Sequence, residues 1–143
     1  MPAHIIAQGL GAFAGVAAAN IMFELPAFSA SRHARTGPSQ WLSEFIATFG
    51  LLAVIWGCSR QRAAAVPFAV GAYIVAAYWF TASTSFANPA VTLARAATDT
   101  FAGIRPADAP GFILAQVVGA AAATSLFRWL FPALPEAGKG KPS

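Results

Sequence analysis

Charged side chains are scarce in this sequence. Asp, Glu, Lys and Arg make up only 10% of its 143 residues, against roughly 25% in an average soluble domain. The net charge of +4 comes from basic residues scattered singly between apolar stretches, without the basic stripe and interleaved aromatics of a nucleic-acid-binding surface. A soluble globular domain and a nucleic-acid partner are therefore both disfavoured.

Cysteine and histidine are also rare. Cys58 is the single cysteine, so the chain can form neither an internal disulfide nor a cysteine metal site. The two histidines, His4 and His33, lie at the mouth of an apolar stretch and in a loop, and we expect no metal or catalytic pair from them. No region groups a nucleophile with a base and an orienting residue. The sequence predicts a protein that is not an enzyme and that binds no cofactor or metal.

The sequence consists mainly of long apolar runs, and 57% of its residues are hydrophobic. Four runs, at about 3–24, 41–58, 63–82 and 110–131, approach the ~20 residues that a spanning helix needs. The first run has no basic residues before it, unlike a secretory signal peptide. We therefore expect an all-α membrane protein with four spanning helices in the lipid bilayer.

The polar segments predict the orientation of the chain. Residues 132–143, with three prolines and two lysines, are expected to form a disordered cytoplasmic tail after a membrane region at 1–131. Four spans place both termini on one side, and the positive-inside rule makes that side the cytoplasmic face of the cell membrane. The basic residues on that side are Arg60, Arg62, Arg128, Lys139 and Lys141, with Arg32, Arg35 and Arg105 opposite.

The stretch SFANPAVTLAR at 85–95 predicts a half-membrane helix. Asn88 suits an N-cap and Pro89 the first helical position, and a helix of about ten residues, ended by Gly103, would rise only about 15 Å. The preceding residues 83–87 are expected to be extended backbone, which membrane depth tolerates only beside protein or a watery cavity. The alternative is a surface loop followed by a short interfacial helix.

A re-entrant helix start would favour neutral polar solutes. Its unpaired amides and positive dipole end disfavour cations near the middle of the membrane. The side-chain amide of Asn88 can donate a hydrogen bond to a passing oxygen. Together these features indicate a water-filled path for uncharged solutes.

An internal repeat supports a transport fold. The segment 4–15 can be laid over 112–123, where both copies share an AQxxGA pattern, and duplicated helices are common in transporters and channels. We expect Gln8 and Gln116 to hydrogen-bond across helices or to a buried loop. Direct contact of these glutamines with the solute is the alternative.

These motifs resemble those of the aquaporin (major intrinsic protein) family. Asn88, Pro89 and Ala90 form its NPA signature, the segment 41–56 is similar to its fourth span, and the two AQxxGA copies resemble its third and sixth spans. The resemblance implies an aquaporin-like helical bundle fragment that holds spans three to six with the second NPA loop. Spans one and two and the first NPA loop are absent from this sequence.

The resemblance also implies a selectivity filter. In the family an arginine follows the second NPA, whereas Val91 stands there in this chain, and the other filter positions correspond to Ala76 and Ser85. Without the guanidinium the constriction should be wider and less polar. Small polyols such as glycerol, or neutral metalloid acids, are then expected besides water. This pattern resembles that of bacterial aquaglyceroporins associated with arsenic resistance.

Two charged residues near the expected pore have competing interpretations. The resemblance implies that Glu44 accepts hydrogen bonds from backbone amides of the re-entrant loop, and proton relay is the alternative. We expect Arg95 to pair with Asp99 one helical turn further on. The alternative for Arg95 is a substitute for the missing filter arginine.

The sequence thus predicts a membrane channel, or a fragment of one, for water and small neutral solutes. By resemblance the complete channel is a homo-tetramer. The competing prediction is a non-conducting remnant or membrane scaffold that needs a partner fragment.

Overall fold

The structure is a computed structural model that describes residues 2–131. This part of the chain is entirely helical and contains no strand. Four helical segments are long and apolar enough to cross a membrane, so the predicted all-α membrane fold is confirmed. The predicted tail at 132–143 lies outside the described residues. The helices are α1 (Pro2–Met22), α2 (Pro38–Gln61), η1 (Ala63–Ala65), α3 (Val66–Phe80), α4 (Pro89–Arg95), η2 (Pro106–Asp108) and α5 (Ala109–Leu130).

Prolines mark where the helices begin. The first amides of a helix have no partner within it, so a proline costs no hydrogen bond there and its fixed φ suits the helix. Each of the five α-helices carries a proline at its first or second position: Pro2, Pro38, Pro67, Pro89 and Pro110.

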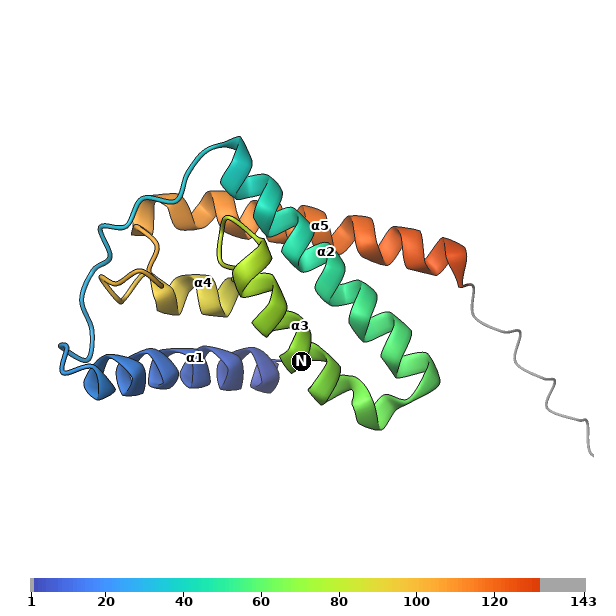
Figure 1. Cartoon of the computed structure of the whole chain (residues 1–143), viewed down its shortest axis with the longest axis horizontal. Helices are drawn as coiled ribbons and strands as arrows, with labels where there is room; N and C mark the ends of the chain where they lie inside the picture. Colours follow the sequence, from blue (N-terminus) through green and yellow to red (C-terminus); the bar gives the residue numbers. More distant parts are fainter. Residues whose placement is uncertain (1, 132–143) are drawn as a thin grey trace, which may run out of the picture.

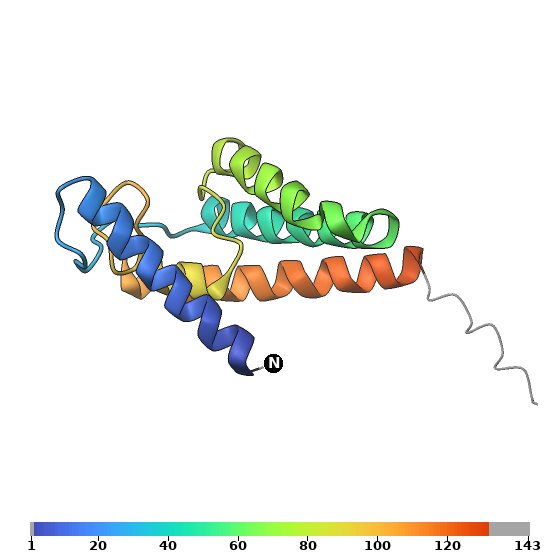
Figure 2. The ribbon, with the colours of Figure 1, turned by 90° about the horizontal axis from the view of Figure 1, so that it is seen from below.

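The tightest packing is between α2 and α5, which lie side by side in Figures 1 and 2. A Cβ atom added to Gly119 would lie 2.7 Å from the carbonyl oxygen of Phe45, so only glycine permits this approach. The chain then folds back after α2, and α3 packs on α2, where the Tyr73 hydroxyl donates to the Ala47 carbonyl at 2.9 Å. These three helices form one layer of the structure.

The helix α4 fills only part of the length of the bundle (Figure 1). It lies between α1 and α5, and its seven residues rise about 10 Å, well short of a ~30 Å hydrocarbon core. The segment that contains α4 leaves the end of α3 and reaches the start of α5 at the same end of the bundle (Figure 1). The re-entrant half-helix predicted from the sequence is thus confirmed.

The half-helix ends earlier than the predicted ten residues because tertiary contacts draw the following segment away. Thr98 donates its hydroxyl hydrogen to the side chain of Asn20 at 2.7 Å. The amide of Asp99 donates to the Ser29 hydroxyl, and the amide of Ile104 returns to the Arg95 carbonyl. The last two bonds occupy the Asp99 amide and the Arg95 carbonyl, which would pair with each other if the helix continued.

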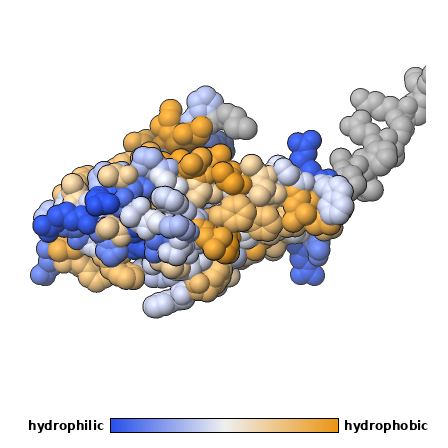
Figure 3. All heavy atoms as spheres, turned by 90° about the horizontal axis from the view of Figure 1, so that it is seen from above, coloured by the Kyte–Doolittle hydropathy of each residue, from blue (hydrophilic) through white to orange (hydrophobic). Residues whose placement is uncertain are grey.

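Apolar side chains cover the outside of the bundle. Phe68, Trp79 and Trp129 are each at least 75% exposed. In the space-filling view, hydrophobic residues prevail between the ends of the long axis, and hydrophilic residues gather toward the ends (Figure 3). Such a surface suits lipid tails rather than water, as expected for a multi-pass membrane protein.

Candidate functional site

Glu44 joins the re-entrant loop to α2. Its side chain is fully buried. The carboxylate oxygen Oε1 accepts hydrogen bonds from the Ser83 hydroxyl at 2.6 Å and the Phe86 amide at 2.8 Å. The oxygen Oε2 accepts from the Ala87 amide at 2.9 Å and from Gln116 Nε2 at 2.7 Å. Four donors from two parts of the chain therefore converge on one carboxylate.

The backbone of the loop is left-handed at three positions, where an extended segment was predicted. Thr84, Ser85 and Ala87 have φ values of 64°, 48° and 49°. Left-handed backbone costs a non-glycine residue about 1–2 kcal/mol. The extended prediction is wrong here because the amides of successive residues must turn toward the same side chain, which a regular strand does not allow.

Asn88 caps the half-helix as predicted. Its Oδ1 atom accepts a hydrogen bond from the Ala90 amide at 2.8 Å and a longer one from the Val91 amide at 3.5 Å. The Asn88 carbonyl accepts from the amide and the hydroxyl of Thr92. Since Oδ1 serves the cap, the side-chain nitrogen of Asn88 is the group that can donate to another molecule.

A cavity of about 230 Å³, the Asn88 cavity, lies in front of this cap. The buried atoms Thr48 Oγ1 and Gln116 Oε1 have no hydrogen-bond partner in residues 2–131. Both residues line this cavity, while these two atoms are themselves buried in the surrounding protein. The cavity is lined by Gln8, Thr48, Leu51, Leu52, Ala87, Asn88, Pro89, Gln116, Val117 and Ala120.

The two repeated glutamines differ in the structure. Gln116 is buried, and its Nε2 atom donates to Glu44 and to the Thr92 hydroxyl, linking α5 with α2 and α4. Gln8 is exposed and forms no hydrogen bond within the described residues. The expected bond of Gln8 to a helix or loop is not formed, because the Asn88 cavity separates Gln8 from the residues of α2 and α5 that line its other walls.

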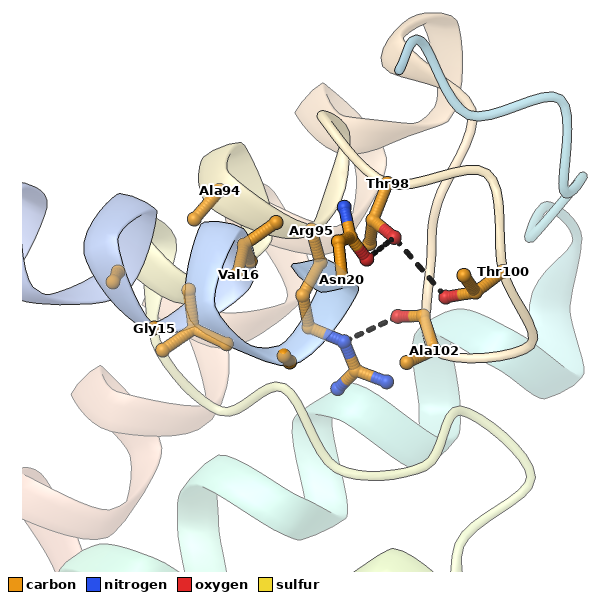
Figure 4. A pocket seen from close by; sticks show the side chains of 11 residues that line it. Gly15, Val16, Asn20, Ala94, Arg95, Thr98, Thr100 and Ala102 are labelled. Atoms are coloured by element: carbon orange, nitrogen blue, oxygen red, sulfur yellow. Dashed lines mark hydrogen bonds between the residues drawn. The ribbon is translucent and has the colours of Figure 1, made fainter. Parts of the chain in front are cut away.

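A second cavity, the α1–α4 cavity, has a volume of about 290 Å³ and lies between α1, α4 and the loop after α4 (Figure 4). Its wall on the α1 side consists of small and apolar residues, and its polar groups come from the end of α1, from α4 and from the loop. The lining residues are Ala12, Gly15, Val16, Ala19, Asn20, Val91, Ala94, Arg95, Thr98, Thr100 and Ala102.

The three positions expected to form the filter do not line the same cavity. Val91 lines the α1–α4 cavity, whereas Ala76 and Ser85 line neither cavity. Ala76 lies on an exposed face of α3. Ser85 is buried in the re-entrant loop, and its hydroxyl has no partner among the described residues.

Arg95 does not pair with Asp99, so this prediction is wrong. Asp99 bonds instead to the side chain of Arg32 at 2.9 Å. The helix ends at Arg95, so Asp99 is not one helical turn further on and turns toward another loop. Arg95 donates to the Ala102 carbonyl and to the Thr84 hydroxyl.

Arg35 is a buried residue that the sequence analysis did not single out. Its guanidinium donates to three backbone carbonyls, those of Gly103 at 2.7 Å, Ser83 at 3.1 Å and Phe101 at 2.6 Å. Burial lowers the pKa of Arg35, and the nearby Tyr78 and Glu44 groups oppose that shift. Arg35 lies in a polar linker, where arginines commonly flank membrane spans. No pattern in the sequence therefore distinguished it as a residue with buried contacts.

The comparisons with known proteins agree with this geometry. Residues 59–142 match the family model described as Major intrinsic protein. The chain is 59% identical over 134 residues to Aquaglyceroporin AqpS of Rhizobium meliloti (strain 1021), an alignment that covers 93% of this chain but 58% of the relative. The chain thus spans less than two thirds of that relative, and no solved structure matches it. The chain belongs to the major intrinsic protein family, whose members are membrane channels and not enzymes.

Proposed function

We propose that this chain forms part of a channel for passive transport of water and small neutral solutes. The observation that carries the proposal is the re-entrant loop, which Glu44 and Gln116 hold so that the Asn88 side chain borders a cavity inside the bundle. In this proposal Glu44 and Gln116 anchor the loop, and Asn88, Pro89 and Ala90 form the constriction. Irregular backbone at membrane depth is expected only where it is buried or lines a watery path.

The lining of the Asn88 cavity favours uncharged solutes. No charged side chain lines it, and its polar groups are amides and one hydroxyl, from Gln8, Thr48, Asn88 and Gln116. Such groups can replace the hydrogen bonds that a neutral hydroxylated solute makes in water, but they cannot compensate a full charge. Glycerol-sized polyols and neutral metalloid acids fit this chemistry.

Val91 supports passage of solutes larger than water. A valine in place of the family's arginine removes a guanidinium with five N–H donors and leaves a small apolar side chain. We propose that Val91, with Ala76 and Ser85, forms a wide filter once the path is closed around them. The name of the relative, Aquaglyceroporin, is in keeping with this class of solute.

The proposal includes completion of the pore by other segments. The exposed Gln8 side chain lines the Asn88 cavity and forms no hydrogen bond within residues 2–131, which suits a further segment that packs against it. By family resemblance that segment belongs to spans one and two with the first NPA loop, and the complete channel is a tetramer. Both termini would lie in the cytoplasm, with residues 1–131 in the cell membrane and 132–143 as a tail.

The open cavity also favours the second candidate function, a non-conducting scaffold. A liposome assay separates the two. We would compare the 143-residue chain with a chimera in which the first two spans and first NPA loop of the rhizobial relative precede it. The chimera should swell in glycerol and in arsenite near neutral pH but not conduct sodium, and the chain alone should be nearly silent.

The substitution Val91→Arg serves as the matched test within the chimera. It should reduce glycerol flux more than water flux, because the guanidinium narrows the path and adds fixed donors. A chimera that inserts and folds but passes neither water nor glycerol would support the scaffold. Equal glycerol flux through the chain alone would show that it completes its own pore.

A further inference from the structure

Arg95 and Val91 lie one helical turn apart on α4 and face the same cavity. The i and i+4 positions of a helix share a face, and both residues line the α1–α4 cavity. In Figure 4 the Arg95 side chain extends past the helix toward the loop that carries Ala102. The cavity that borders the proposed filter position therefore contains a guanidinium.

The protein holds this guanidinium in place without using all of its donors. Arg95 Nε donates to the Ala102 carbonyl, and Nη2 donates to the Thr84 hydroxyl at 2.9 Å. The central carbon of the guanidinium lies 3.6 Å from the centre of the Phe86 ring, a stacked cation–π contact. A guanidinium has five N–H donors, and the others have no acceptor within residues 2–131.

No carboxylate within residues 2–131 forms an ion pair with Arg95. Among the described residues the two ion pairs are Arg32 with Asp99 and Arg105 with Asp108. Glu44 is bound by four other donors and acts on Arg95 only through its charge, which the nearby positive charge of Arg35 opposes. A fixed positive charge in a low-dielectric region acts over many ångströms, and it repels cations.

The rest of the cavity suits a small molecule with a carbon skeleton and hydroxyl groups. Ala12, Val16 and Ala19 provide an apolar wall. On the polar side the hydroxyls of Thr98 and Thr100 lie 3.2 Å apart, on the loop that also carries Ala102 (Figure 4). Apolar lining with a few convergent polar groups is the usual composition of a small-molecule site.

We propose that Arg95 is the specificity-determining cation of this path: its free N–H donors bind hydroxyl oxygens of neutral solutes in the α1–α4 cavity, and its charge excludes cations. This inference rests on the proposed channel function. In this inference Arg95 supplies the charged hydrogen-bond donor, and Val91, one helical turn earlier, leaves space for the solute because its side chain is small. The seven-residue half-helix supplies only a short dipole, so a full charge is the stronger barrier to cations.

The flux experiment uses the chimera with Arg95→Met, Arg95→Lys and the control Arg32→Met. Arg32 is an arginine whose side chain is 89% exposed and which lines neither cavity. Arg95→Met should raise sodium leak roughly tenfold, since the repulsive charge is lost. Arg95→Lys should keep sodium excluded but lower glycerol flux severalfold relative to water, because the planar fork is lost. Arg32→Met should behave as the unsubstituted chimera.

A second measurement does not require conduction. In the 143-residue chain labelled with ¹⁵N-arginine in detergent, the Nε–H signal of Arg95 is identified by its loss in Arg95→Lys. It should shift on addition of glycerol more than the Arg32 signal does. This readout also covers the case in which Arg95→Met fails to fold.

The outcomes distinguish the two proposals. Unchanged sodium leak in folded Arg95→Met, or an Arg95 signal that responds to glycerol no more than that of Arg32, overturns the role of Arg95. An unsubstituted chimera that passes no glycerol, with an Arg95 signal that still responds, overturns the channel function and leaves the solute site in place.

Discussion

Gln116 and Glu44 are 72 positions apart in the chain, and their side chains meet at 2.7 Å in the middle of the bundle. This bond connects α5 to α2, and the same nitrogen of Gln116 reaches Thr92 on the half-helix at 2.8 Å. The contact therefore joins the re-entrant loop, α2, α5 and the half-helix α4 in a single buried polar network. Such networks are stabilising when every member has a partner and costly when one is lost.

The anchoring role proposed for Glu44 predicts different effects of two substitutions. Glu44→Ala leaves the buried amides of Phe86 and Ala87 without their acceptor, at a cost of roughly 1–3 kcal/mol. Glu44→Gln retains one acceptor oxygen and the shape of the side chain, so this variant should remain folded and lose less stability than Glu44→Ala. Thermal unfolding in detergent measures both, and equal midpoints for the two variants would count against an anchor.

The contacts of Arg35, in the segment between α1 and α2, predict that its substitution destabilises the fold. Arg35→Met keeps much of the aliphatic stem but leaves the carbonyls of Ser83, Phe101 and Gly103 without their donor. Because hydrogen bonds to charged groups contribute about 1.5–3 kcal/mol, we expect destabilisation of at least about 2 kcal/mol. Arg32→Met, at an exposed arginine, should change the unfolding midpoint little. Similar effects of the two variants would contradict the contacts of Arg35.

The close approach of α2 and α5 at Gly119 predicts that a larger side chain at this position destabilises the contact. The Cβ of Gly119→Ala would lie 2.7 Å from the Phe45 carbonyl oxygen, and backbone cannot yield as a flexible side chain can. We expect the helices to separate locally at a cost of about 1–3 kcal/mol. Gly11→Ala on α1, where no atom lies within 4 Å, is the matched control and should be neutral or slightly stabilising. The prediction fails if the two variants unfold at the same temperature.

The contact of Asp99 with Arg32, which lies outside the spanning helices, predicts that the stability of the fold depends on pH. The backbone amide of Arg32 is the largest cause that lowers the pKa of Asp99, followed by the Arg32 side chain. A carboxyl whose pKa is lower in the folded state stabilises the fold above its unfolded pKa of about 3.9, and this contribution is lost as pH falls through the folded value. Arg32→Met keeps the amide, so the Asp99 pKa, followed by carboxyl NMR, should rise part of the way. An unchanged Asp99 titration would exclude the side-chain contribution.

Local sequence patterns were sufficient for the spans and for the start of α4. Apolar run length predicts each long helix, and Asn88 with Pro89 predicts the helix start because capping depends on neighbouring residues only. The end of α4, the left-handed loop and the partner of Arg95 depend on contacts with Asn20, Glu44 and Arg32. No periodicity in the sequence records such distant contacts, so these features required the structure.

The position of Glu44 also sets an order of assembly. Glu44 lies on α2 and enters the membrane during synthesis before any of its four hydrogen-bond donors, which follow at Ser83, Phe86, Ala87 and Gln116. An ionisable side chain without partners is costly in a bilayer, so α2 should remain near the translocation machinery or water until the loop has been made. The last donor comes from α5, and the network closes only when α5 inserts.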